Sequence, residues 1–162
     1  MAARPWPEAD PVDAIMEVMI EAFDPAFGEA WNRRQVSDAL VLGTCRHHLI
    51  APDGRIGEHL VGETAGFYLA RTVLDEQELL LFAVAPRFRG RGLGTRLLDD
   101  FISSARDNGV RRVFLEMRRG NNAARLYEKY GFRFTGERPA YYRGSDGRRH
   151  DALSYEAVLA LP

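Results

Sequence analysis

Residues 81–95 constrain this chain most, because an apolar strand-like run there enters a turn rich in arginine and glycine and then a helical pattern. Glycines at 90, 92 and 94 remove the Cβ atoms that would hold backbone N–H groups away from a ligand. A helix that begins near Leu93 points its free N–H groups and the positive end of its dipole at the same spot. The pattern therefore predicts a pyrophosphate site, and with it a phosphate-bearing cofactor.

The chain length of 162 residues is typical of one domain, so we expect a single domain over residues 1–162. The 46% hydrophobic and 28% charged residues are ordinary for a globular protein, and no apolar run approaches the roughly 20 residues of a membrane helix. Residues 1–7 lack the apolar core of a signal peptide, and a single cysteine, Cys45, excludes an internal disulfide. We therefore expect a cytoplasmic protein that does not associate with membranes.

The net charge of −1 combines 22 basic with 23 acidic residues, and the arginines gather in residues 87–96, 106–119 and 143–149. Domains dedicated to nucleic acid usually carry a basic excess together with aromatic platforms. Because acidic residues balance the arginines here, we expect local phosphate binding and no direct binding of nucleic acid.

Hydrophobic periodicity and turn residues predict alternating helices and strands. Helical patterns cover residues 11–23, with Asp10 as the N-cap, and residues 32–42, 93–109 and 122–130. In the first of these, apolar residues recur at helical spacing: Val12, Ile15, Met16, Met19, Ile20 and Phe23. Strand patterns cover residues 46–51, 62–72, 78–85, 113–117, 132–136 and 153–159. The first three strands predict an antiparallel meander, and the strand–helix–strand unit after them a parallel crossover, which together give an α/β fold with a mixed sheet.

Two side chains have both a chemical and a structural interpretation. Glu116 interrupts an apolar strand, and strand alternation places it on the face opposite Leu115 and Met117. A carboxylate there is either a general base or the structural partner of a nearby arginine (Arg112 or Arg118) or of a backbone amide. Tyr127 lies on the apolar side of a short helix and is either a core residue or a proton donor.

Other ligand-binding motifs fit the sequence less well. A Walker A loop requires Gly-Lys-Ser/Thr, whereas residues 94–96 are Gly-Thr-Arg, and a dinucleotide fingerprint that begins at Gly90 needs its last glycine at residue 95, which is Thr95. A tight turn without a ligand is the remaining alternative. Residues 45–48, Cys-Arg-His-His, lack further ligands at a recognised spacing, so we expect no metal site.

The signature Arg-x-x-Gly-x-Gly at residues 89–94, the helix after it, the strand with Glu116 and the run LYEKYGF at residues 126–132 closely resemble the GNAT superfamily of N-acetyltransferases. The resemblance extends from residue 79 to residue 132, and the elements before it occur in the order of that superfamily. It implies a GNAT-like fold, with a central mixed, mostly antiparallel twisted sheet flanked by helices. It also implies acetyl-CoA as the co-substrate.

The resemblance assigns roles to individual residues. Glu116 matches the general base and Tyr127 the acid that protonates the departing thiolate, while Asn121 matches an asparagine that contacts the cofactor. The segment between Glu116 and Tyr127 is one residue shorter than the pattern, so Asn122 is the alternative to Asn121. The pyrophosphate would lie on the turn amides and the pantetheine arm along the strand before them, a cofactor-binding set of Leu81, Phe82, Ala83, Val84, Arg89, Gly90, Arg91, Gly92, Leu93, Gly94, Thr95 and Asn121.

Within the superfamily, residues 115–118, Asn121 and the pair Tyr141 and Tyr142 are most similar to the branch that acetylates the N-terminal alanine of a bacterial ribosomal protein. This implies direct acetyl transfer in a ternary complex to a protein N-terminus, with both tyrosines binding the substrate; we expect a monomer. Three alternatives stay open at this point: acetylation of a small amine, a non-catalytic acetyl-CoA-binding module, and RNA or ribosome binding through the arginine clusters.

Overall fold

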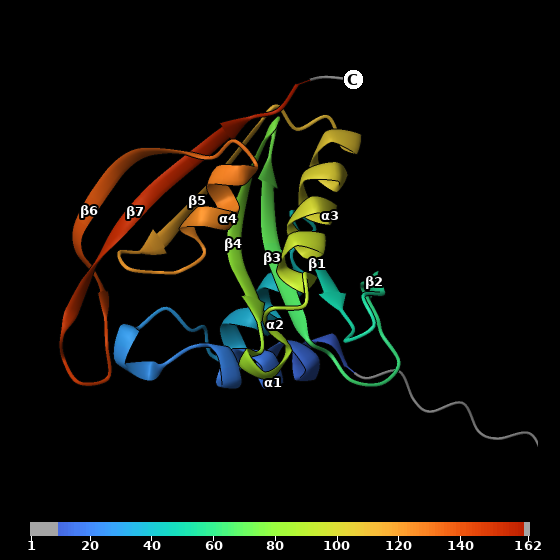
Figure 1. Cartoon of the computed structure of the whole chain (residues 1–162), viewed down its shortest axis with the longest axis horizontal. Coiled ribbons are helices and arrows are strands. Elements are labelled where there is room, and N and C mark those ends of the chain that lie inside the picture. The colour runs from blue at the N-terminus through green and yellow to red at the C-terminus, as the bar shows by residue number, and fades with distance from the viewer. Residues whose placement is uncertain (1–9, 161–162) are drawn as a thin grey trace, which may run out of the picture.

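The computed structural model describes residues 10–160, so the prediction made from residues 1–7 lies outside the described part (Figure 1). The helices are α1 (Pro11–Ala22), η1 (Pro25–Phe27), α2 (Arg33–Val41), η2 (Pro86–Phe88), α3 (Leu93–Asp107) and α4 (Ala124–Lys129). The strands are β1 (Cys45–Ile50), β2 (Ile56–Gly57), β3 (Gly66–Val73), β4 (Glu76–Val84), β5 (Arg112–Arg118), β6 (Arg133–Arg143) and β7 (Arg149–Val158). None of the helices within residues 10–160 is long and apolar enough to cross a membrane.

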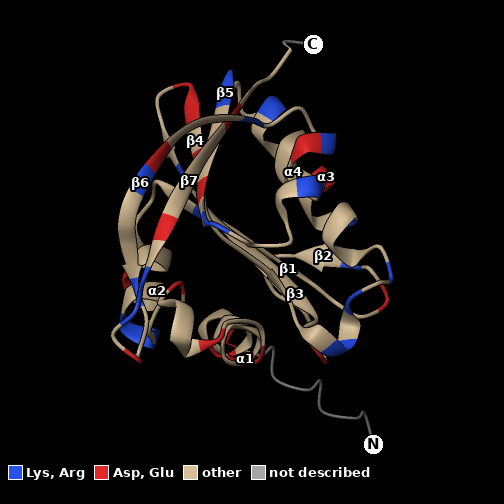
Figure 2. Cartoon of the chain, turned by 60° about the vertical axis from the view of Figure 1, so that its left-hand side comes forward, with Lys and Arg blue, Asp and Glu red and all other residues tan. Residues whose placement is uncertain are grey.

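The strands form one seven-stranded sheet in the order β2-β1-β3-β4-β5-β7-β6. Within residues 10–160, only β4 and β5 pair in parallel, through the crossover that contains α3, and the other neighbouring strands are antiparallel. Helices α1 and α2 cover one face of the central strands, and α3 packs on the opposite face (Figure 2). The predicted mixed sheet flanked by helices, its meander and its parallel crossover are all confirmed.

Local signals set where the helices begin. The side chain of Asp10 accepts a hydrogen bond from the Val12 amide at 2.9 Å, as its predicted N-cap role requires. Asn32 and Gln35 form a reciprocal capping box at the start of α2. Helix α3 then buries one apolar side under the sheet, consisting of Leu93, Leu97, Leu98, Phe101, Ile102 and Ala105.

Several boundaries differ from the predictions. The short strand β2 was not predicted, and α4 begins at Ala124 rather than at residue 122. Strand β6 extends to Arg143 and β7 begins at Arg149, because the two strands pair with each other up to this point of the hairpin. Ile20 is exposed instead of facing the core, whereas Ile15 and Met19 are buried as expected, together with Ala14 and Val18.

A polar cluster joins α3 to the sheet. Asp100 of α3 accepts a hydrogen bond from the Tyr68 hydroxyl at 2.8 Å, and the same carboxylate oxygen lies 2.5 Å from Nδ1 of His48. Burial acts to raise the pKa of Asp100, but the hydrogen bonds from His48 and Tyr68 and the charge of His48 outweigh it, so that the pKa falls below its ordinary value. The cluster therefore stabilises the folded state while Asp100 is ionised.

Replacing Asp100 with asparagine is expected to lower the free energy of unfolding by about 1–3 kcal/mol at pH 7, because hydrogen bonds to a charged group usually contribute this much to stability. Because the folded-state pKa of Asp100 is depressed, this stabilisation is present above the unfolded pKa of about 3.9 and is lost as the pH falls through the folded pKa. Urea unfolding at pH 7 and pH 3 measures the difference. Asp38→Asn, at an exposed residue of α2, is the control; equal effects of the two variants would contradict the prediction.

Candidate active site

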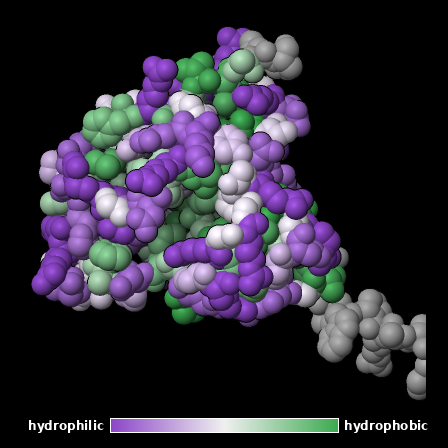
Figure 3. All heavy atoms as spheres, in the orientation of Figure 1, coloured by the Kyte–Doolittle hydropathy of each residue, from purple (hydrophilic) through white to green (hydrophobic). Residues whose placement is uncertain are grey.

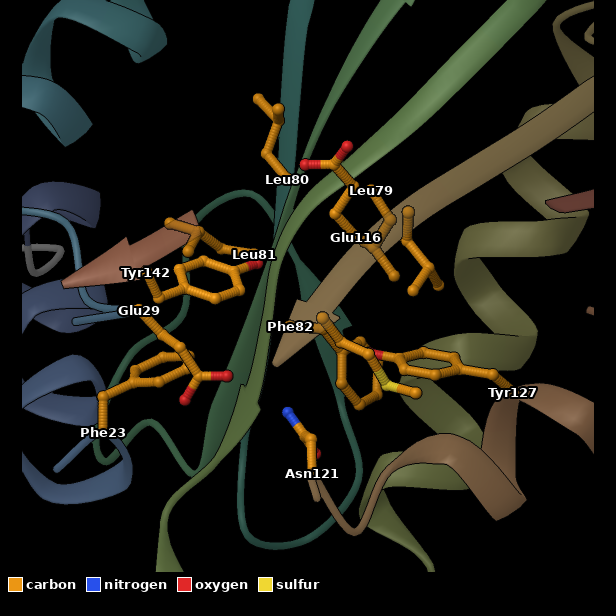
Figure 4. A pocket seen from close by; sticks show the side chains of 12 residues that line it. Phe23, Glu29, Leu79, Leu80, Leu81, Phe82, Glu116, Asn121, Tyr127 and Tyr142 are labelled. Carbon is orange, nitrogen blue, oxygen red and sulfur yellow. The ribbon is translucent and has the colours of Figure 1, made fainter. Parts of the chain in front are cut away.

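Strands β4 and β5 separate in the middle of the sheet. Their parallel pairing ends at Leu79 and Leu115, whereas β4 continues alongside β3 as far as Val84. A bulge leaves Leu80 without a partner on β3 where the two strands part, and bulges are common beside active sites. The side of β4 that faces β5 is therefore open over residues 80–84, as Figure 4 shows. This open edge includes the residues predicted to pair with a pantetheine arm.

Glu116 is the first residue of β5 beyond the parallel pairing, so the fold places its side chain where the two strands separate. The side chain is 20% exposed, and its Oε1 lies 3.0 Å from Nε of Arg138. The sequence offered Arg112, Arg118 or a backbone amide as the structural partner. Arg138 of β6 takes that place from across β7, where Ala152 pairs with Arg138 and Ser154 pairs with Glu116. The pairing of β6, β7 and β5 brings these two side chains together.

Tyr127 is buried where α4 meets the sheet. Its ring packs edge-on against Phe82 of β4 and Phe132, with centroid distances of 5.9 and 5.6 Å. Burial first, and the neighbouring Glu29 and Tyr142 second, raise the pKa of Tyr127 above its ordinary value. The phenol therefore stays protonated at neutral pH and can donate a hydrogen bond or a proton.

The two candidate asparagines differ in placement. The side-chain oxygen of Asn121 accepts a hydrogen bond from the Ala123 amide at 2.9 Å, and its amide nitrogen points into the gap between β4 and β5 (Figure 4). Asn122 is exposed and borders one cavity of the site, whereas Asn121 borders two. The geometry favours Asn121 as the side chain able to reach a ligand between the strands.

The glycine turn presents an open backbone surface. Gly90 and Gly92 have φ angles of +78° and +79°, and a Cβ at either position would have no neighbour within 4 Å. In the described part of the chain, no backbone carbonyl accepts a hydrogen bond from an amide of residues 90–95, as is usual at the beginning of a helix. Nε of Arg89 donates to the Val84 carbonyl at 3.0 Å and fixes the turn to the end of β4. These features fit a pyrophosphate group.

Three adjoining cavities run through the gap between the strands. The turn-side cavity, of about 590 Å³, is bordered by Arg89, Gly90 and residues 120–123, and the hairpin-side cavity, of about 360 Å³, by Tyr141, Tyr142 and Arg143. Between them a central cavity of about 50 Å³ is lined by Glu116, Tyr127, Asn121 and the open edge of β4. In Figure 3 the face seen in Figure 1 is hollowed near its middle, with hydrophobic residues at the bottom and hydrophilic ones around it. The structure thus brings the predicted site residues of β4, β5, α4 and the β6–β7 hairpin to one channel.

Sequence comparison assigns this arrangement to a family. The sequence model of the acetyltransferase (GNAT) family matches residues 13–132, which include the glycine turn, Glu116 and Tyr127. The chain belongs to this family. The resemblance stated from the sequence is confirmed.

Two relatives of this chain are named as N-acetyltransferases. The [ribosomal protein bS18]-alanine N-acetyltransferase of Haemophilus influenzae is 40% identical over 94 residues, which are 58% of this chain and 64% of that protein, less than two-thirds of its length. The N-alpha-acetyltransferase RimI of Mycobacterium tuberculosis is 38% identical over 123 residues, or 75% of this chain and 70% of that protein.

A solved structure extends the likeness to nearly the whole chain. The crystal structure of the ribosomal-protein-S18-alanine N-acetyltransferase from Escherichia coli has a TM-score of 0.75 and 28% sequence identity, and the alignment covers 94% of this chain and 88% of that one. The GNAT fold therefore includes β6 and β7, which lie outside the family match.

One residue of this GNAT site was missed by the sequence analysis. Glu29, in the segment between α1 and α2, borders all three cavities. It belongs to no helix or strand, so no periodicity marks it, and its only sequence signal is a carboxylate between two predicted helices. Tertiary contacts alone bring it to the channel.

The segment that carries Glu29 is locked to the β6–β7 hairpin. The Ser145 amide donates to the Pro25 carbonyl at 3.0 Å, and His150 Nε2 lies 3.1 Å from the Ala26 carbonyl. The contact is so close that a Cβ at Gly144 would collide with the Ala26 carbonyl, and one at Gly28 with the Arg143 carbonyl. The two segments therefore form a continuous wall beside the hairpin-side cavity.

Gly144→Ala is expected to lower the free energy of unfolding by about 1–3 kcal/mol, because the new methyl group must push the two segments apart. Faster amide exchange within residues 24–31 should accompany the loss. Gly136→Ala is the matched control, since a Cβ there has no neighbour within 4 Å and stability should change by less than about 0.5 kcal/mol. Equal stability of the two variants would contradict the close contact.

Proposed function

We propose that this protein is an acetyl-CoA-dependent Nα-acetyltransferase that transfers acetyl directly, in a ternary complex, to the N-terminal amine of a protein. The observation that carries the proposal is the placement of Glu116 and Tyr127 on the wall of one small cavity, between a cavity that reaches the glycine turn and one beside the hairpin. A donor and an acceptor could then meet there from opposite ends of the channel. The names of the relatives favour the N-terminal alanine of a ribosomal protein as the acceptor.

The chain's own groups would hold acetyl-CoA along the turn-side half of the channel. The open amides of residues 90–95 suit its pyrophosphate, and the unpaired edge of β4 over residues 81–84 suits the amide groups of its pantetheine arm. Bound there, acetyl-CoA supplies an activated acetyl group. The amide nitrogen of Asn121 adds a hydrogen-bond donor beside this path.

The residues of the central cavity would then perform three tasks. Glu116 takes a proton from the acceptor ammonium, and a backbone N–H of residues 82–84 polarises the carbonyl that the amine attacks. The hydroxyl of Tyr127 donates a hydrogen bond to the departing sulfur. Burial raises the pKa of this phenol further above the value of about 8.5 for a thiol, which favours hydrogen-bond donation over complete proton transfer. Alignment of the two reactants would contribute most, about 7–11 kcal/mol, against roughly 10²–10⁴-fold from each proton-transfer group.

The hairpin-side cavity favours a chain terminus as the acceptor. Tyr141 and Tyr142 line it, and the contact between the Glu29 segment and the hairpin closes one side of it. A flexible end can enter such a cavity, whereas the middle of a folded chain would collide with the wall.

Intact-mass spectrometry tests the proposal. Alanine-first peptides, the same peptides blocked at the N-terminus and free small amines are each incubated with the protein and acetyl-CoA. We expect one added acetyl group on the free peptides only. Acetylation of small amines alone would overturn the protein acceptor, and demonstrated acetyl-CoA binding without any transfer would make the protein a non-catalytic binding module.

A further inference from the structure

Glu29 occupies a position in the channel that no other described residue shares, because it alone borders the turn-side, central and hairpin-side cavities. Its carboxylate points toward the gap between β4 and β5, on the same side as Tyr142 (Figure 4). An acceptor that passes from the hairpin-side cavity to the central cavity therefore moves along a wall that includes this carboxylate.

The surroundings of Glu29 leave its oxygens available. Its Oε2 lies 3.4 Å from Nε of Arg118, and the two side chains are only 12% and 16% exposed. That nitrogen is buried and makes no hydrogen bond within the described residues, while the guanidinium of Arg118 stacks on the Phe27 ring at 3.8 Å. Arg118 thus offsets the charge of Glu29 without using its hydrogen-bonding capacity, and a buried carboxylate is normally hydrogen-bonded.

The two carboxylates of the channel differ in their partners. Glu116 forms an ion pair with Arg138 at 3.0 Å, whereas Glu29 lies farther from its arginine, with 3.4 Å between Oε2 and Nε of Arg118. Both carboxylates, after burial, raise the pKa of Tyr142, so this hydroxyl lies within the field of both. An ammonium group that enters between them would meet two carboxylates, each balanced by one arginine, and would find hydrogen-bond acceptors on Glu29.

We propose that Glu29 is an acceptor-binding residue: its carboxylate accepts hydrogen bonds from the ammonium group of the incoming amine, which then moves to Glu116 and is deprotonated there. The inference rests on the proposed function, because it requires an amine acceptor. Glu29 contributes to binding and Glu116 to the chemical step, so the two residues affect different kinetic constants.

Steady-state kinetics with an alanine-first peptide at saturating acetyl-CoA test this division. Glu29→Gln is expected to raise the KM for the peptide about 10- to 100-fold, the usual effect of losing one charge-assisted hydrogen bond, with kcat changed less than about threefold. The Kd for acetyl-CoA should stay constant. Glu17→Gln, an equal charge change on the exposed side of α1, should leave all three constants unchanged.

A second variant separates binding from a structural role. Glu29→Gln leaves Arg118 buried without its counter-charge, which destabilises proteins in general. The double variant Glu29→Gln/Arg118→Met removes both charges, so it should regain stability and keep the raised KM. Return of KM to the wild-type value in the double variant would reduce Glu29 to a structural partner and overturn the proposal.

A dead-end inhibitor gives a readout that does not depend on turnover. A peptide that lacks only the N-terminal amino group should bind the wild-type protein more weakly than the free peptide, and Glu29→Gln should remove this difference. Equal discrimination in both proteins would overturn the role of Glu29 while leaving the proposed function intact. A wild-type protein that acetylates no amine would instead overturn the proposed function itself.

Discussion

Replacing Glu116 with glutamine is expected to lower kcat by about 10²- to 10⁴-fold, the usual contribution of a positioned general base. Glutamine keeps the shape of the side chain and its place at the end of the β4–β5 pairing but cannot take the proton of the acceptor ammonium. Because Glu116 borders the central and hairpin-side cavities and not the turn-side cavity, the Kd for acetyl-CoA should remain within about twofold. CoA release in a thiol assay and isothermal titration with acetyl-CoA measure the two quantities.

The matched control for this variant is Glu156→Gln on the neighbouring strand β7. Glu156 also pairs with an arginine, Arg112, but it borders none of the three cavities. Its replacement removes one carboxylate and breaks one ion pair, as in Glu116→Gln, and should leave kcat unchanged. Full activity of Glu116→Gln at neutral pH would refute the assignment of Glu116 as the base.

The double substitution Gly92→Val/Gly94→Val is expected to abolish acetyl-CoA binding, with Kd raised more than about 100-fold, because several charge-assisted hydrogen bonds to the pyrophosphate are lost together. At Gly92 the φ of +79° is unfavourable for valine, and the side chain would fill the open space above the turn amides. At Gly94 a Cβ makes only ordinary contacts, to Leu126 and Val84, so Gly92 should dominate the effect. Isothermal titration with acetyl-CoA and with CoA checks the result.

Gly109→Val separates binding from stability in this experiment. Gly109, just beyond the other end of α3, has a φ of +75° and open space around its Cβ position, so valine there causes comparable backbone strain. Loss of thermal stability should be similar in Gly109→Val and the single variant Gly92→Val, whereas only Gly92→Val should lose affinity for acetyl-CoA. Equal affinity of these two variants would contradict a pyrophosphate site at the turn.

Features that depend on neighbours in the sequence could be predicted well. Asp10 caps α1 and Asn32 caps α2, and both could be located because capping hydrogen bonds span two or three residues. Alternation placed Glu116 on the face opposite Leu115 and Met117, and the burial pattern of β5 agrees. The GNAT family was identified from the same local motifs, and the family match includes them.

Features that depend on long-range pairing could not be predicted. The extension of β6 to Arg143 needs its partner β7, and residues 137–143 alone contain a proline and several polar residues that indicate a loop. The partner of Glu116 is Arg138, which lies two strands away across the sheet. The bulge at Leu80 follows from the registers of two strand pairs and leaves no mark in the sequence of β4.

The sequence by itself determined the family, the glycine turn and the two candidate catalytic side chains, because spacing along one strand, turn or helix specifies each of them. Only the tertiary structure decided how these parts form a site. The separation of β4 and β5, the placement of Glu29 beside all three cavities and the wall formed with the hairpin each require segments far apart in the chain. The physical reason is that side-chain periodicity reports which face of an element is buried, whereas a cavity is defined by what packs against that face.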